Sequence, residues 1–304
     1  MSCNPSAVMS FNSNSCLEEI HVFYQGPGNN GELYHAWTNQ SLSWQQEKIN
    51  GAGISNSPSA VVFQLTTYVF FQGSGNPTDV YGMMMDSSGN WVPGAWGNNG
   101  ILPNVSTISM PSAFYHNGSL YVSYDPGGNT MYYVATSDGV TWSEPVQIAQ
   151  IALSQAPALT VLNGNLYCLM QAPGKPGYAG EVTHSGTTFC AFTGPNGQLS
   201  LMYQNTTLLN STMDLGSSPG VATFGSTLYC FETRNGSLFY NTYDDSSGWS
   251  SQKLIANGVE WANTSPSAIE FANKFYVFCE NPGGGAGVPL DRRWCELVRR
   301  AERG

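Results

Sequence analysis

The chain has 304 residues, of which 41% are hydrophobic and only 10% are charged. Twenty acidic against ten basic side chains give a formal net charge of −10, which argues against nucleic acids and anionic membranes as partners, because both are bound by clustered lysine and arginine. No apolar run approaches the roughly 18 residues of a membrane-spanning helix, so no membrane insertion is expected.

A proline-anchored apolar phrase returns along the chain and divides it into units. It reads Asn-Pro-Ser-Ala-Val at residues 4–8, Ser-Pro-Ser-Ala-Val at 57–61 and Ser-Pro-Ser-Ala-Ile at 265–269. Self-similarity at a period of about 50 residues is typical of propellers, solenoids and arrays. A ring of equivalent units can offer a ring of equivalent sites. The units begin near residues 4, 57, 110, 156, 218 and 265.

The units predict four short strands in a fixed order. The first opens at the proline, where no hydrogen-bond donor of the ladder is lost. The second is aromatic and β-branched, at residues 20–24, 67–71, 120–124, 166–170, 228–231 and 275–278. The third runs through 33–37, 80–83, 131–134 and 238–241, and the fourth opens on Trp44, Trp91, Trp142 and Trp249. This pattern predicts an all-β fold, a β-propeller of about six four-stranded blades within residues 1–282.

The fourth unit and the end of the chain depart from the pattern. The 62 residues from Pro157 to Pro219 predict longer loops, and the pattern does not place the outer strands there. After Pro282 comes a glycine-rich linker and a basic tail (283–304) with apolar residues at helical spacing. We therefore expect an incomplete last blade, followed by a tail that is either a partner-binding helix or an accidental appendage.

The turn before the fourth strand carries the most specific local motif. Residues 136–142, Thr-Ser-Asp-Gly-Val-Thr-Trp, resemble the Asp-box of sialidases and related propellers, and 86–91 and 245–249 are degraded versions. In such a turn the carboxylate accepts backbone donors, the glycine takes a positive φ and the indole packs beneath. We expect these turns to be structural and to lie on the face opposite to a ligand.

The cysteines and the amino terminus bear on metal binding and on the cellular location of the protein. Cys168, Cys230 and Cys279 occupy second-strand positions, which predicts small buried side chains with free thiols. No Cys/His spacing of a zinc site occurs, so no metal and no cofactor are expected. The first residues lack the charged and apolar regions of a secretory signal, which predicts a protein that is cytoplasmic or released without a classical signal peptide.

A polar residue follows the second strand in every unit, beside an aromatic or bulky residue. Amides and carboxylates bind paired sugar hydroxyls, and an aromatic face packs on the apolar side of a sugar ring. The same polar residues could instead close the strand-end turn by bonding backbone groups. The predicted carbohydrate-binding residues are Tyr24, Gln25, Asn29, Phe71, Gln72, Asn76, Tyr124, Asp125, Gln171, Phe231, Glu232 and Glu280.

The Ser-Pro-Ser-Ala-Val phrase, Val-Phe-Tyr-Gln-Gly at 22–26 and Gly-Asn-Asn-Gly-Glu-Leu-Tyr at 28–34 resemble the β-propeller lectins that bind fucose and related sugars. The likeness is closest to the seven-bladed bacterial kind and more distant to the six-bladed fungal fucose lectins, and it covers residues 1–282. It implies a multivalent lectin with sites between blades, glycans or glycoproteins as partners, and fucose as one candidate sugar. Fungal fucose lectins use a repeated arginine, whereas this chain has one before the tail, Arg234.

Three classes of function remain open from the sequence. A sugar-binding, non-enzymatic propeller is favoured, because the candidate site repeats and no unit stands out. A glycoside hydrolase would need two carboxylates in one funnel, and its plausible suppliers are Asp125, Glu232, Glu260 and Glu280. A protein-interaction propeller is the third class. The oligomeric state stays open.

Overall fold

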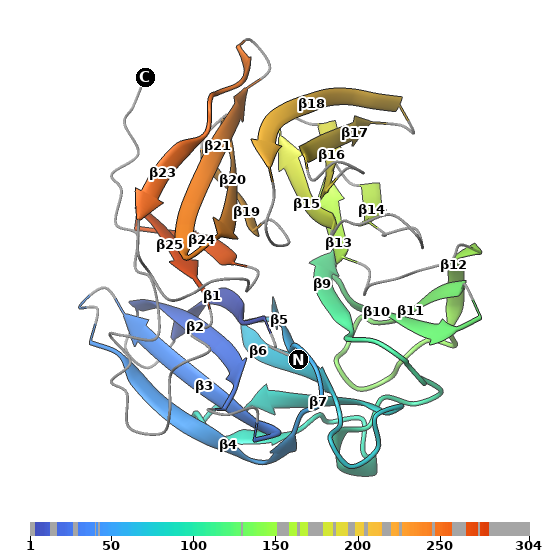
Figure 1. Cartoon of the computed structure of the whole chain (residues 1–304). Helices are drawn as coiled ribbons and strands as arrows, with labels where there is room; N and C mark the ends of the chain where they lie inside the picture. Colours follow the sequence, from blue (N-terminus) through green and yellow to red (C-terminus); the bar gives the residue numbers. More distant parts are fainter. Residues whose placement is uncertain are drawn as a thin grey trace. The chain divides into compact units, whose positions relative to one another are not determined.

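The structure is a computed structural model (Figure 1). It describes residues 4–12, 17–26, 30–39, 41, 43–128, 130–150, 158–162, 165–169, 179–184, 187–193, 198–203, 206–214, 220–224, 227–244, 247–256, 266–272 and 274–279. The contacts divide the chain into two compact units with a boundary between Leu159 and Thr160.

The first unit contains three four-stranded antiparallel sheets, each with its strands hydrogen-bonded in chain order. The first sheet consists of β1 (Ser6–Asn12), β2 (Leu17–Gln25), β3 (Glu32–Asn39) and β4 (Gln45–Gly53). The second consists of β5 (Ser59–Phe63), β6 (Thr66–Gln72), β7 (Val80–Met85) and β8 (Trp91–Pro93). The third consists of β9 (Ser112–His116), β10 (Ser119–Gly127), β11 (Thr130–Thr136) and β12 (Val146–Gln150).

The strands after residue 157 form four further sheets. A two-stranded sheet pairs β13 (Ala158–Leu162), which spans the unit boundary, with β14 (Asn165–Leu169). A four-stranded sheet follows with β15 (Ala179–His184), β16 (Thr187–Thr193), β17 (Gln198–Tyr203) and β18 (Thr206–Asp214). Next come β19 (Gly220–Phe224), β20 (Thr227–Arg234), β21 (Ser237–Asp244), β22 (Gly248–Trp249) and β23 (Lys253–Ala256). The last pair is β24 (Ser267–Phe271) with β25 (Lys274–Phe278).

The four-strand repeat is confirmed in the first three sequence units, and two details differ from the expectation. The fourth sequence unit holds six strands in two sheets, because β15 to β18 lie in the span where the sequence predicted longer loops and did not place the outer strands. The tryptophan of the third unit, Trp142, precedes its fourth strand by four residues, since β12 begins at Val146. The last unit contains its first two strands, β24 and β25, whereas the positions of its third and fourth strands and of the basic tail lie beyond residue 279, outside the described residues.

The apolar core of the first unit lies between neighbouring sheets. Phe23, Leu33 and Ile49 of the first sheet pack with Val69 and Phe71 of the second, and all five are almost fully buried. Burial of large side chains on both partners is the main source of cohesion between such sheets, at about 1.5–3 kcal/mol for each. Of the three second-strand cysteines, Cys230 and Cys279 are buried and form no disulfide, as predicted, and the side chain of Cys168 falls outside the described part.

The recurring Pro-Ser-Ala phrase joins the first sheet to the second and the second to the third. Ser6 Oγ accepts a hydrogen bond of 2.9 Å from the backbone N–H of Ala60, and Ser59 Oγ accepts one of 2.9 Å from Ala113. These bonds hold β1 beside β5 and β5 beside β9, so the first strands of consecutive sheets are neighbours. The repeat recognised in the sequence is therefore an inter-sheet joint.

Helix is nearly absent from the described residues, where a single 3₁₀ turn occupies Asn98–Gly100. In the same part of the chain, no helix has the length and apolar character needed to cross a membrane.

Candidate functional site

The Asp-box-like turns have the structural role that the sequence predicted. Asp138 Oδ1 accepts hydrogen bonds from the backbone N–H groups of Val140 (2.8 Å) and Thr141 (2.7 Å) and from the Thr136 hydroxyl (2.9 Å). These donors stabilise the carboxylate and hold the pKa of Asp138 far below its usual range. Gly139 has φ +74°, and a Cβ there would lie 2.9 Å from Tyr68 Oη, so glycine is required for both reasons.

The tryptophans beside these turns pack onto the preceding sheet. Trp91 meets Phe23 edge to face with ring centroids 5.2 Å apart, and its indole N–H donates to Glu47 Oε1 at 3.0 Å. Trp142 meets Phe70 in the same way at 6.0 Å. Each ring therefore fixes one sheet against its neighbour.

The polar residues predicted to bind sugar are buried at the ends of their second strands. Gln25 is 8% exposed and its amide donates to the Ile54 carbonyl at 3.3 Å. Gln72 is 5% exposed, donates to the Pro77 carbonyl and accepts from the Ser55 hydroxyl at 3.3 Å. Asp125 accepts from the backbone N–H of Gly127 at 2.7 Å. These contacts match the turn-closing alternative that the sequence left open.

The neighbouring aromatic residues belong to the core. Tyr24, Phe71, Tyr124 and Phe231 are all buried, so they present no open ring face. The first three stack on a third-strand tyrosine, as Phe71 does on Tyr81 with centroids 5.9 Å apart. The Tyr81 ring also covers Gly73, where a Cβ would lie 2.5 Å from Tyr81 Cε2. Close packing therefore explains the glycine after Gln72.

The remaining predicted residues are scattered. Asn76 is exposed, and its side chain donates to Asp79 Oδ2 at 2.8 Å and accepts from the Thr78 hydroxyl at 2.9 Å. Glu232 pairs with Phe239 in the ladder of β20 and β21. Asn29, Gln171 and Glu280 lie outside the described residues. The structure thus does not bring the predicted set together, and a sugar-binding role for it stays a prediction.

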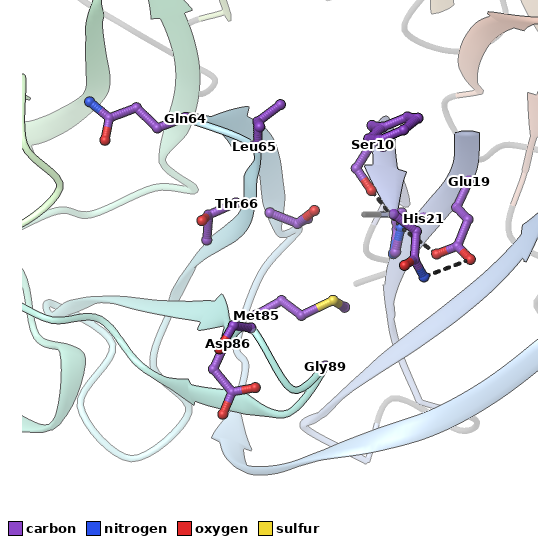
Figure 2. A pocket seen from close by; sticks show the side chains of 13 residues that line it. Ser10, Glu19, His21, Gln64, Leu65, Thr66, Met85, Asp86 and Gly89 are labelled. Carbon is purple, nitrogen blue, oxygen red and sulfur yellow. Dashed lines mark hydrogen bonds and ion pairs between the residues drawn. The ribbon is translucent and has the colours of Figure 1, made fainter. Parts of the chain in front are cut away.

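A pocket opens on the opposite face, between the first and second sheets, with a cavity volume of about 240 Å³. Figure 2 shows Ser10, Glu19 and His21 along one wall and the turns that follow β5 and β7 along the other. The lining residues are Ser10, Phe11, Asn12, Glu19, His21, Gln64, Leu65, Thr66, Thr67, Met85, Asp86, Ser87 and Gly89.

The pocket wall combines hydroxyl, amide and carboxylate groups with an apolar rim. Hydroxyls come from Ser10, Thr66, Thr67 and Ser87, and negative charge from Glu19 and Asp86. Phe11 is 47% exposed and Leu65 is 77% exposed, so apolar surface borders the polar wall. The lining contains no lysine or arginine. The described residues contain no group of three or more His, Cys, Asp and Glu side chains suited to a metal ion.

A chain of buried hydrogen bonds runs from the pocket into the first sheet. Ser10 Oγ lies 2.8 Å from His21 Nε2, and His21 Nδ1 lies 2.8 Å from His35 Nε2. His35 Nδ1 lies 3.1 Å from Glu47 Oε1. The planes of the two imidazoles differ by 3°, with ring centroids 5.0 Å apart, so the rings meet edge to edge along this bond. His21 and His35 are 2% and 1% exposed.

The carboxylate at the inner end sets the direction of this chain. Trp91 Nε1 lies 3.3 Å from His35 Nδ1 and 3.0 Å from Glu47 Oε1, and its N–H donates along the shorter contact, to the carboxylate. Because ionised Glu47 can only accept, His35 also donates to it from Nδ1 and accepts on Nε2 from His21 Nδ1–H. His21 Nε2 then accepts from the Ser10 hydroxyl. Burial, together with neighbouring His35, lowers the pKa of His21 to about 3, and burial also lowers the pKa of His35. Both imidazoles are therefore neutral near neutral pH.

A serine hydrogen-bonded to a histidine beside a cavity also suggests a nucleophile and its base. An effective base needs a pKa near the working pH, whereas the pKa of His21 is lowered to about 3. Proton transfer from Ser10 to His21 is therefore strongly unfavourable. The arrangement serves to orient Ser10, whose proton points inward and whose lone pairs remain for the pocket.

The corresponding space between the second and third sheets is filled by aromatic side chains. By the repeat spacing Phe63 takes the place of Ser10 and Tyr68 that of His21, and both are buried. Trp96 stacks on Phe70 and meets Trp142 edge to face at 5.4 Å. The two clefts of the first unit are therefore unequal, with polar groups in one and a packed aromatic cluster in the other.

Sequence reasoning missed the pocket because its residues do not repeat. A search for equivalent positions selects what the units share, and here the shared residues are the joints and the core. The sequence signal for the pocket is a difference between units: the first unit has Ser10, His21 and His35 where the second unit has Phe63, Tyr68 and Gly82. Buried polar residues at core positions of one unit alone indicate a local function.

Comparisons with known proteins support the fold. The chain is similar to the six-bladed Aleuria aurantia lectin, a fungal lectin with 13% identity and a TM-score of 0.54, over 100% of this chain and 98% of that one. It is similar to AofleA from Arthrobotrys oligospora (11% identity, TM-score 0.56, 91% and 79% covered) and to the lectin SapL1 (15%, 0.51, 92% and 90%). No family model and no curated protein sequence matches the chain. The likeness confirms the predicted β-propeller fold.

Proposed function

We propose that the protein is a carbohydrate-binding propeller that holds a small hydroxyl-rich sugar in the pocket between its first and second sheets. The observation that carries this proposal is the pocket wall, where hydroxyl and carboxylate groups stand next to exposed Phe11 and Leu65. Sugars present hydroxyls for the former and an apolar C–H face for the latter. Sites for drug-sized ligands span roughly 300–1,000 Å³, so a cavity of about 240 Å³ suits a ligand of monosaccharide size.

The similar structures add support for this class of ligand. One was determined with α-methyl fucoside bound to SapL1, and another is described by a fucose recognition mode of the Aleuria aurantia lectin. Fucose therefore heads the panel of sugars to be tested. The pocket lacks the arginine that the resemblance leads us to expect, so neighbouring neutral sugars belong in the same panel.

Because only one of the two clefts in the first unit is open, we expect fewer sugar-binding sites than there are sheets. Phe63 and Tyr68 fill the second cleft, so we propose one site in this unit, at the first cleft. A shallow site with a few hydrogen bonds and one apolar contact gives a dissociation constant on the order of 0.1–1 mM. Multivalent binding of a glycan surface would then need further sites in the second unit or self-association, and would raise the apparent affinity by roughly 10²–10⁴.

Titration calorimetry with α-methyl fucoside, galactose, glucose and xylose tests the proposal. A Ser87→Trp variant should block the pocket, because Ser87 is an exposed turn residue on its wall. A Ser137→Trp variant is the matched control, since Ser137 is exposed in the corresponding turn of the third sheet. We expect binding to be lost in the first and kept in the second.

A Gln25→Ala variant addresses the opposite face. If it abolished sugar binding while Ser87→Trp bound normally, the site would lie at the strand ends predicted from the sequence. A panel of chromogenic glycosides separates binding from hydrolysis, because turnover that depends on one carboxylate would establish a hydrolase.

A further inference from the structure

We infer that this pocket selects a ligand carrying a protonated amine, as in an amino sugar, over a neutral or anionic sugar of the same size. The inference rests on the proposed function, since it names the chemical class of ligand for the same site. Two features carry it: the charge of the pocket wall and the orientation of its hydrogen-bond donors.

The charge of the wall is negative and is not compensated within the pocket. Glu19 and Asp86 both line it, and the lining contains no lysine or arginine. His21, the remaining titratable group of the lining, is neutral because it is buried against His35. An anionic sugar would therefore meet repulsion, whereas an ammonium group would be attracted.

Three side-chain donors of the wall are already committed to protein acceptors. The Ser10 hydroxyl donates to His21, Asn12 Nδ2 donates to Glu19 Oε1 at 3.0 Å, and Gln64 Nε2 donates to the Ser137 carbonyl at 3.0 Å. What Ser10 and Glu19 retain on this wall are acceptors. A ligand group that contacts Ser10 and Glu19 must therefore supply the donors, and an ammonium group supplies three with a positive charge.

Glu19 is the anchor for such a group. Its side chain is 12% exposed, and its Oε2 lies 3.6 Å from His21 Nε2. That nitrogen carries no proton, because it accepts from Ser10, so it provides no hydrogen bond to the carboxylate. Asp86 has a different task, since its Oδ1 accepts from the backbone N–H groups of Ser88 (2.9 Å) and Asn90 (2.8 Å) and shapes the turn. Glu19 thus holds a nearly buried oxygen that an ammonium group would satisfy.

Calorimetric titration with glucosamine, glucose, N-acetylglucosamine and glucuronate, below the pKa of the glucosamine amine, tests the inference. Each of the other three sugars differs from glucose at a single carbon, and the four differ in charge. We expect glucosamine to bind roughly ten-fold more tightly than glucose, as charge-assisted hydrogen bonds do relative to neutral ones. N-acetylglucosamine should lose this gain, and glucuronate should bind most weakly.

Two carboxamide variants localise the effect. Glu19→Gln should remove the preference for glucosamine while glucose still binds, because the amide keeps the shape and loses the charge. Glu18→Gln is the matched control, with the same change in net charge at an exposed neighbour on β2 that does not line the pocket. It should keep the preference. Thermal unfolding of both variants checks that they fold.

The outcomes separate the inference from the proposed function. Equal affinity for glucosamine and glucose in the wild type would overturn the inference and leave sugar binding in place. Loss of the preference in Glu18→Gln as well as in Glu19→Gln would replace the specific anchor by general surface charge and overturn it too. Absence of binding by every sugar would refute the proposed function itself.

Discussion

Acidification should destabilise the first sheet through its buried histidines. The pKa of His21 allows us to estimate the loss in free energy of unfolding. Its pKa is lowered from 6.5 to about 3 in the folded protein, where it is 2% exposed. Between these two values the unfolded chain binds a proton that the folded chain does not, so the free energy of unfolding falls as the pH falls. Each pH unit below 6.5 costs about 1.4 kcal/mol, which amounts to about 2 kcal/mol near pH 5. His35, whose pKa is also lowered by burial, acts in the same direction.

Urea unfolding followed by tryptophan fluorescence between about pH 7 and about pH 5 measures this loss. A His21→Gln variant keeps hydrogen-bonding groups at the same place and removes the titration, so its stability should fall by about 2 kcal/mol less over that range. His116→Gln, at a half-exposed position at the end of β9, controls for the loss of a histidine. The reasoning is refuted if wild type and His21→Gln lose stability in parallel as the pH falls.

Three further perturbations probe the scaffold. Trp142→Ala should lower the free energy of unfolding by about 3–5 kcal/mol, because it empties the contact with Phe70 and Trp96; chemical denaturation measures this, and a cost below 1 kcal/mol would contradict it. Gly139→Ala should cost about 1–3 kcal/mol, because φ is +74° there and the new Cβ would approach Tyr68. It should cost more than Gly89→Ala, where φ is +83° and nothing lies within 4 Å. Equal melting temperatures of the two variants would show that the approach to Tyr68 contributes nothing. Gln72→Ala should cost about 1–3 kcal/mol, because it leaves the Pro77 carbonyl without this donor and removes one acceptor of the Ser55 hydroxyl. Sugar affinity should be unchanged, and a selective loss of affinity would place the site at the strand ends that carry Gln25 and Gln72.

Most of the fold could be predicted from the sequence because its signals are local and repeated. Alternating apolar runs, turn residues and a strand-opening proline recur in each unit, so an error in one unit is corrected by the others. The fourth unit shows the limit of this reasoning. No Ser-Pro-Ser-Ala phrase precedes β15, so the sequence predicts longer loops here and does not place the strands β15 to β18, which form a regular four-stranded sheet.

The candidate site was harder to predict, because a glutamine at a strand end can have either of two roles, and the sequence looks the same for both. Gln25 and Gln72 can face a ligand or satisfy backbone groups, and only the position of the following chain decides between them. In the structure both side-chain amides donate to backbone carbonyls, Gln25 to Ile54 and Gln72 to Pro77. The pocket depends on the pairing of Ser10 with His21 and on a wall supplied by residues 64–67 and 85–89, which are distant in sequence from Ser10 and unlike their counterparts.

The Pro-Ser-Ala joint has a consequence for how such a chain can change in length. Within one copy of the phrase, Ser59 accepts from the sheet that follows and Ala60 donates to the sheet that precedes. Adjacent residues thus carry the two halves of the junction, and tandem duplication of a unit copies both. An inserted unit would bond to both neighbouring sheets through the same serine acceptor and alanine N–H donor. After deletion of a unit, the serine of the preceding sheet could accept from the alanine of the following one. Gain or loss of whole units therefore preserves the junction chemistry, while the clefts that they enclose are free to diverge.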